Sequence, residues 1–157
     1  MSEADLLALR VTLTLAAVTT LILLLLGTPL AWWLARTRSR LAVAVEAVVA
    51  LPLVLPPTVL GFYMLVALGP HGPIGGTLES VGLHHLAFTF EGLVLASTLY
   101  SLPFMVQPLK DAFAAVGSRL LDAAATLRAG PWDSFFTVVA PMARRGFLTA
   151  LTLTFVH

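Results

Sequence analysis

Residues 11–35 read VTLTLAAVTTLILLLLGTPLAWWLA, a stretch of 25 positions without a charged side chain. A helix needs roughly 20 mainly apolar residues to cross about 30 Å of hydrocarbon. Residues 47–70 form a second charge-free run. Residues 92–109 form a third, which reaches the same length when the apolar residues from Leu86 are included. The three runs predict three membrane-spanning helices.

The composition agrees with a chain that lies mostly in lipid. Of 157 residues, 59% are hydrophobic and 11% are charged, whereas about a quarter of the residues in an ordinary soluble domain are charged. The net charge of +1 gives no reason to expect a nucleic-acid partner. The absence of cysteine excludes disulfides, iron–sulfur clusters and thiol catalysis. We therefore expect the lipid bilayer to be the main surroundings of this chain.

The predicted fold class is all-α, a polytopic transmembrane bundle with three complete spans and part of a fourth. We expect helices over about 9–35, 43–69 and 87–110, followed by a segment outside the membrane over 111–134 and the start of a fourth helix. The N-terminal residues MSEAD lack the basic side chains of a signal peptide, so the first helix is expected to stay in the protein. A single transmembrane domain then covers residues 1–157.

The basic residues predict the orientation of these helices. Arg36, Arg38 and Arg40 lie between the first two predicted helices, and five more basic residues follow the third. With the N-terminus outside, eight of the nine basic residues face the cytoplasm and only Arg10 does not. Lys and Arg concentrate in cytoplasmic loops. We therefore expect a multi-pass protein with its N-terminus outside and residues 111–134 in the cytoplasm.

Proline recurs inside the predicted helices, where each one removes a backbone donor and clashes with the preceding turn. In lipid the freed carbonyls need partners from neighbouring helices or from water in a cavity, so such helices suit a protein that lines a pathway. The alternative is that membrane helices simply tolerate proline. Gly27, Ala31 and Ala35 recur at every fourth position, as in close helix contacts. The candidate pathway residues are Pro52, Pro56, Pro57, Thr58, Pro103 and Gln107.

Residues 118–141 read SRLLDAAATLRAGPWDSFFTVVAP and predict two helices joined by a turn. Ser118 is a plausible N-cap, Gly130 is expected to supply a left-handed cap that ends the first helix, and Pro131 suits the first turn of the second. Apolar residues on a loop outside the membrane indicate a protein contact or, alternatively, a position in the lipid interface. These residues are Leu120, Leu121, Leu127, Trp132, Phe135 and Phe136.

This elbow resembles the EAA loop of ABC-importer permeases, the cytoplasmic segment that contacts the ATPase. The family pattern is Glu-Ala-Ala, three residues, Gly, nine residues, an apolar residue, one more, and Leu-Pro. Asp122 takes the place of the glutamate, while Arg128 and Ala140 replace the glycine and the leucine. The resemblance implies that eight residues couple the protein to an ATPase: Asp122, Ala123, Ala124, Leu127, Arg128, Gly130, Trp132 and Pro141.

Four further stretches are similar to molybdate permeases: LPLVLPPTVLGFY at 51–63, GPHGPIG at 69–75, FTFEGLVLAS at 88–97 and SLPFMVQPL at 101–109. The resemblance implies the membrane subunit of a bacterial inner-membrane importer for molybdate, with tungstate or sulfate as alternatives. It also implies a homodimer with a second permease copy, cytoplasmic ABC ATPase subunits that hydrolyse ATP, and a periplasmic molybdate-binding protein. It implies no catalytic residue and no cofactor in the permease itself.

Other kinds of site have weaker support. His71, His84 and His85 follow no metal-ligand spacing, so no metal site is expected. The glycine-rich loop 69–76 could form an anion-binding nest, although a tight connection between helices needs no such role. An intramembrane enzyme would need a catalytic dyad, which the sequence does not suggest, and the elbow argues against a plain channel. Residues 146–157 would span only about 18 Å as a helix, so we expect a truncated permease, and a non-functional permease fragment is a further alternative.

Overall fold

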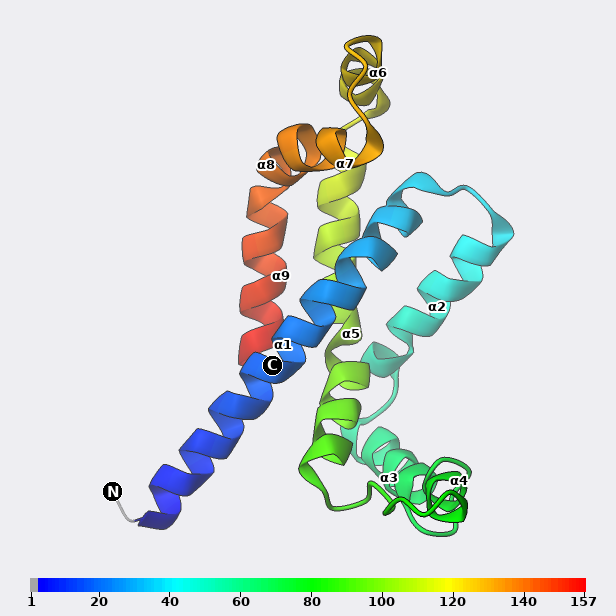
Figure 1. The fold of residues 1–157 in the computed structure, drawn as a ribbon, viewed down its shortest axis with the longest axis vertical. Helices are drawn as coiled ribbons and strands as arrows, with labels where there is room; N and C mark the ends of the chain where they lie inside the picture. The colour runs from blue at the N-terminus through cyan, green and yellow to red at the C-terminus, as the bar shows by residue number, and fades with distance from the viewer. Residues whose placement is uncertain (1–2) are drawn as a thin grey trace.

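The fold is a bundle of helices built around three long ones. The computed structural model describes residues 3–157, and every regular element in this range is helical. Helix α1 (Glu3–Arg36) crosses α5 (Phe90–Ala115), and α9 (Arg144–Val156) packs against both (Figure 1). The expected all-α class is therefore confirmed.

The remaining elements connect these helices at the two ends of the bundle. We call the end where α1 and α5 finish the elbow end, because α6, α7 and α8 lie there (Figure 1). The start of α1, α3 and α4 lie toward the opposite end. The shorter elements are α2 (Arg40–Val54), α3 (Pro57–Leu68), α4 (Gly75–Ser80), α6 (Ser118–Thr126), α7 (Pro131–Ser134), the π-helical η1 (Phe135–Val139) and α8 (Ala140–Met142).

Within residues 3–157, α1 and α5 are each long and apolar enough to cross a membrane. Helices α2 and α3 pass the same test only as a pair, and they are bent by 110° at the break between them. The prediction of one continuous helix over 43–69 is therefore wrong. The described residues contain two such helices, or up to three spans if the bent pair counts as one.

Two adjacent prolines explain the break. Leu55 precedes Pro56 and has φ −78° and ψ 133°, and Pro56 precedes Pro57 with φ −56° and ψ 137°. A residue before proline is pushed out of the helical region by the proline ring, so two successive residues become extended. Pro57 then opens α3 at a position where its missing N–H is not needed.

Single prolines have no such effect here. Pro29 lies inside α1, Pro52 inside α2, and Pro103 and Pro108 inside α5, and each of these helices continues past its proline. The alternative that membrane helices tolerate isolated prolines holds at these four positions. Only the paired prolines redirect the chain.

Small residues allow α1 to approach α5 closely. A Cβ atom added to Gly27 would lie 3.0 Å from Cγ of Met105, and Ala31 is fully buried. Ala35, the third residue of this predicted face, is half-buried against the same core. Lipid tails are as apolar as these side chains, so the hydrophobic effect does little to bring two membrane helices together. Close van der Waals packing holds them together instead. The predicted close helix contact is confirmed at Gly27 and Ala31.

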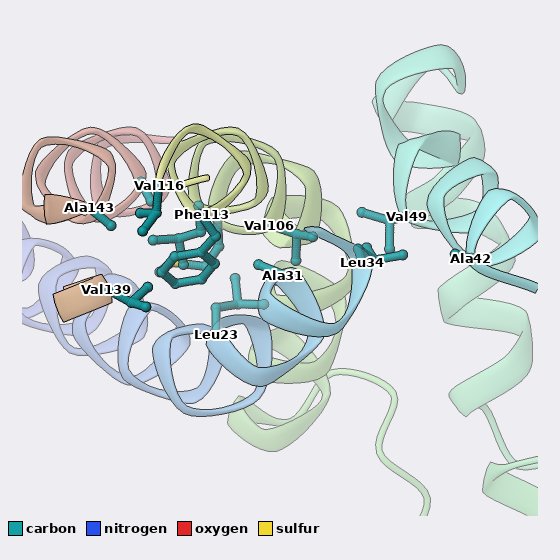
Figure 2. Close-up of a cluster of buried hydrophobic side chains, with 13 residues drawn as sticks. Leu23, Ala31, Leu34, Ala42, Val49, Val106, Phe113, Val116, Val139 and Ala143 are labelled. Carbon is teal, nitrogen blue, oxygen red and sulfur yellow. The ribbon is translucent and has the colours of Figure 1, made fainter. Parts of the chain in front are cut away.

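Phe113 on α5 is the centre of the core at the elbow end (Figure 2). Its side chain is 1% exposed. Its ring meets the edges or faces of Trp32, Phe135 and Phe147 at centroid distances of 5.4, 5.9 and 5.7 Å. Edge-to-face arrangements of this kind are the preferred geometry of aromatic pairs. The cluster ties α1, η1 and α9 to the last turns of α5.

An ion pair joins α2 to α5. Lys110 Nζ donates to Glu46 Oε1, and the side chains are 22% and 47% exposed respectively. Glu46 is the seventh residue of α2, about 9 Å along the helix from its start. A partly exposed carboxylate gains modestly from such a partner. Lys110 therefore stabilises the position of α2 beside α5.

Candidate functional site

The elbow comprises residues 117–143 and begins where α5 ends. Val116 still has helical backbone angles, but Gly117 has φ 69° and turns the chain away from the α5 axis. Helix α6 then starts at Ser118, so Gly117 occupies the N-cap position and the prediction that Ser118 is the N-cap is wrong by one residue. Figure 1 shows α6 projecting beyond the bundle while α7 and α8 lie across its end.

The turn after α6 has a left-handed residue, but not the expected one. Arg128 has φ 61°, whereas Gly130 has φ −69° and ψ 167°. The Arg128 N–H donates to Ala125 O at 3.0 Å, and the Ala129 N–H donates to Ala124 O at 3.1 Å. These two bonds form a Schellman motif, in which the residue after the C-cap adopts the left-handed conformation. The prediction that Gly130 supplies this cap is therefore wrong.

The corrected turn explains the family pattern at position 128. The EAA pattern has glycine there, and glycine is the residue that enters the left-handed region without a steric cost. This chain keeps the same backbone conformation with an arginine. Gly130 is instead the N-cap residue of α7, and Pro131 occupies the first helical turn as predicted.

Most of the eight candidate coupling residues lie on the surface of the elbow. Ala124 alone is buried, at 8% exposure. Leu127 is 84% exposed at the end of α6. A large apolar side chain that protrudes this far has almost no contact within the chain. The other exposed candidates are Asp122, Ala123, Arg128, Gly130, Trp132 and Pro141.

The apolar residues of the elbow divide into an inner and an outer set. Leu121 and Phe135 are half-buried against the core, and the Phe135 ring lies 5.5 Å from that of Trp32. The outer set is strongly exposed, and the rings of Trp132 and Phe136 stack at 6.3 Å. The inner set anchors the elbow to α1 and α5, and the outer set is free to meet other molecules. The outer residues are Leu120, Leu127, Trp132 and Phe136, at 43, 84, 77 and 64% exposure.

The candidate pathway residues fall into two places. Pro103 is buried in α5, and Gln107 lies one turn further along at intermediate burial. Pro52 is buried in α2. The residues at the break between α2 and α3 are exposed in this single chain: Pro56, Pro57 and Thr58.

Two features of the site have no local signal in the sequence. The partners of the Glu46–Lys110 pair are 64 positions apart. Gly146 on α9 also approaches Ala112 on α5 closely, and these two residues are 34 positions apart (146 − 112). A charged residue next to each apolar run was the only hint of the first contact. A glycine near the start of the fourth helix was the only hint of the second. Within residues 3–157, no group of three or more His, Asp or Glu side chains could hold a metal ion.

The fold and the elbow define a class of protein: a multi-pass helical membrane protein that projects a short helix from one end of its bundle. Comparison with known proteins identifies the family. Residues 27–157 match the family described as binding-protein-dependent transport system inner membrane component. The chain belongs to this family of inner-membrane transport subunits, as its resemblance to importer permeases predicts.

Individual relatives support this assignment. The chain is 67% identical to the molybdenum transport system permease protein ModB of Azotobacter vinelandii over 157 residues, which is 100% of this chain and 70% of that protein. It is 39% identical to ModB of Mycobacterium tuberculosis over 148 residues, 94% of this chain and 56% of that protein. With ModB of Escherichia coli K12 the identity is 36% over 148 residues, 94% of this chain and 65% of that protein.

Proposed function

We propose that this protein is the membrane-spanning subunit of an ABC importer for molybdate. The observation that carries the proposal is the 67% identity, over every residue of the chain, to a molybdenum permease. Tungstate and sulfate are the alternatives, because these anions share the tetrahedral shape and the charge of molybdate. Selection among them is expected to reside mainly in a periplasmic binding protein, with the permease providing the route.

The proposed assembly contains a second permease copy, two cytoplasmic ABC ATPase subunits and a periplasmic molybdate-binding protein. ATP hydrolysis takes place in the ATPase subunits, and the permease supplies no catalytic residue. Closure of the ATPases would rock the two permease copies between inward-facing and outward-facing arrangements. The elbow end faces the cytoplasm in this scheme, which leaves the N-terminus outside and puts Arg36, Arg38 and Arg40 on the cytoplasmic side.

In this scheme α6 is the helix that docks on the ATPase. Its exposed residues Asp122 and Ala123 and the protruding Leu127 would form the contact, and Arg128 and Gly130 would set the direction of the chain that leaves it. Displacement of α6 would reach the bundle through Phe135, whose ring touches those of Trp32 and Phe113. This aromatic contact is rigid enough to move α1 and α5 with the elbow.

The break between α2 and α3 is the proposed flexible point of the pathway. Pro56 and Pro57 interrupt the backbone hydrogen bonds, so the angle between the two helices can change without breaking a continuous helix. Thr58 follows the break, and Pro103 and Gln107 lie on α5, with which both α2 and α3 are in contact. These residues are proposed to line or shape the route of the anion.

The proposal is tested by purifying the protein with its associated subunits from its own cells. The ATPase and the binding protein should co-purify, and elemental analysis of the binding protein should find molybdenum. Tungsten or sulfur in its place would select one of the alternatives. Recovery of the intact protein with no ATPase would overturn the proposal.

The docking role of α6 is tested by Leu127→Asp. A charge at the tip of α6 should abolish co-purification of the ATPase and leave insertion into the membrane intact, because Leu127 makes little contact within the chain. Leu83→Asp is the matched control, since Leu83 is 58% exposed and lies between α4 and α5 at the opposite end. ATPase binding that survives Leu127→Asp would remove the coupling role from α6.

A further inference from the structure

An apolar groove of about 720 Å³ lies between α1, the second half of the elbow and α9. Leu25, Pro29 and Trp32 line it from α1, Trp132 and Phe136 from the elbow, and Leu151 from α9. Thr28 is the one hydroxyl-bearing residue among its lining side chains. No residue of the described chain, 3–157, fills this space.

The groove has a cationic end. The Arg36 guanidinium lies 4.3 Å from the centroid of the Trp32 ring, which is part of the groove wall. Arg144 is in the first turn of α9, three residues before Phe147 and seven before Leu151, so helical spacing puts it on the face that lines the groove. Both arginines are exposed, and in the described residues neither forms an ion pair with a carboxylate.

The surrounding charges leave this end positive. The acidic residues of the elbow are Asp122 and Asp133, both exposed, and Asp122 lies close enough to Arg36 to act on it electrostatically. Arg145 adjoins Arg144, and further arginines follow Arg36 in the loop to α2. An anion at the mouth of the groove would therefore meet an excess of positive charge. The tryptophans at the same level, Trp32 and Trp132, are the side chains that prefer the headgroup region of a bilayer.

We propose that this groove binds an anionic phospholipid, with an acyl chain against the apolar wall and the phosphate at the arginine end. Basic pockets between membrane helices attract anionic headgroups in this way, and a guanidinium can give a phosphate two parallel hydrogen bonds. The Trp32 ring holds Arg36 over the groove wall before any lipid arrives, which lowers the ordering cost of binding. The proposal rests on the chain spanning a membrane and not on the anion that it transports.

The second half of the elbow then has a different partner from the first half. Trp132, which the sequence pattern groups with the ATPase contact, lies on the groove wall beside α1 and α9. Leu127 does not line the groove. A bound lipid would hold α7 and η1 in the plane of the membrane surface while α6 projects from it, and so would define the angle of the elbow.

Fluorescence quenching by brominated lipids tests the proposal in the intact protein reconstituted into vesicles. A Trp33→Phe variant leaves Trp32 and Trp132, both on the groove wall, as the remaining tryptophans. Vesicles of phosphatidylcholine and phosphatidylglycerol are prepared twice at the same composition, with bromine on the acyl chains of one lipid or the other. We expect brominated phosphatidylglycerol to quench the tryptophan fluorescence more strongly, with a preference of about fivefold for each arginine that contacts the headgroup.

Arg36→Gln with Arg144→Gln should abolish the preference, whereas Arg10→Gln, at the opposite end of α1, should leave it unchanged. Equal quenching by both lipids in the parent variant would overturn the proposal in favour of ordinary boundary lipid. Absence of quenching by either lipid would overturn it too, because it would mean that another subunit or a second copy covers the groove. Native mass spectrometry of the chain with all its tryptophans provides an independent measure: retained phosphatidylglycerol should be lost in the double arginine variant and kept in Arg10→Gln.

Discussion

Replacing Gly146 by alanine should force α9 away from α5. A Cβ atom at Gly146 would lie 2.3 Å from Cβ of Ala112 and 3.3 Å from the carbonyl oxygen of Pro108. Neither neighbour is the end of a flexible side chain, so neither can turn aside. Carbon atoms in contact are normally about 3.5–4.0 Å apart, and the two helices would therefore have to separate by roughly 1.5 Å at this point.

The separation affects the core next to it. Phe147 follows Gly146 directly and packs on Phe113, so its contacts would be loosened as well. A radial gap of about 1 Å forfeits up to half of a dispersion contact, and overpacking typically costs about 1–3 kcal/mol. We expect a loss near 2–3 kcal/mol in the free energy of unfolding, at the upper end because both obstacles are rigid.

The measurement is a titration with sodium dodecyl sulfate in mixed micelles, followed by tryptophan fluorescence. Ala112→Gly in the same chain should relieve the 2.3 Å contact and restore about 1–2 kcal/mol as a coupling energy in the double-mutant cycle. Gly61→Ala in α3 is the control, because nothing lies within 4 Å of its added Cβ. If Gly146→Ala unfolds at the same detergent concentration as Gly61→Ala, then α5 and α9 do not pack as described.

Three further outcomes follow from single contacts. Arg128→Gly should raise the free energy of unfolding by about 1 kcal/mol, since glycine adopts φ 61° without strain, whereas Ala123→Gly inside α6 should lower it by about 1 kcal/mol. Lys110→Met should destabilise the protein by about 1 kcal/mol, because Glu46 loses its partner. The loss stays small because the Glu46 side chain is 47% exposed. Adding Glu46→Gln should recover most of this loss in the same titration. Finally, Arg38→Cys in this cysteine-free chain should resist a membrane-impermeant thiol reagent applied from outside, and labelling of that cysteine in intact cells would reverse the proposed orientation.

Hydrophobic runs predict the long helices well because length and apolarity are local properties. The expected helix over 9–35 is α1 at 3–36, and that over 87–110 is α5 at 90–115. The differences arise at charged residues. Glu3 and Asp5 extend α1 because acids favour a helix N-terminus. Lys110 and Asp111 are compatible with helix, so α5 continues past the point where the apolar pattern ends.

The corrected predictions concern backbone geometry rather than hydrophobicity. The proline count in residues 51–63 was informative, but the adjacency of Pro56 and Pro57 decides the fold there, since it makes two successive residues extended. At the elbow, the presence of Gly130 favoured a left-handed cap at the wrong residue. Helix α6 has its C-cap at Leu127, so Arg128 is the residue that follows the C-cap. Arg128 adopts the left-handed conformation there although it is not a glycine.

Adjacent side chains on the elbow show why the groove was beyond sequence analysis. Phe135 and Phe136 are chemically identical, yet one packs on Trp32 and Phe113 and the other is 64% exposed beside Trp132. They belong to a π-helical turn, in which the Ala140 N–H donates to Phe135 O. Pro141 follows that turn, and its ring would clash with the carbonyl of residue 137 in a regular α-helix. A wider turn relieves the clash and changes the rotational phase of the helix, so the proline sets which phenylalanine faces the core. The sequence identifies both residues as apolar, and the structure shows that Phe135 packs on the core while Phe136 is exposed, although both line the groove.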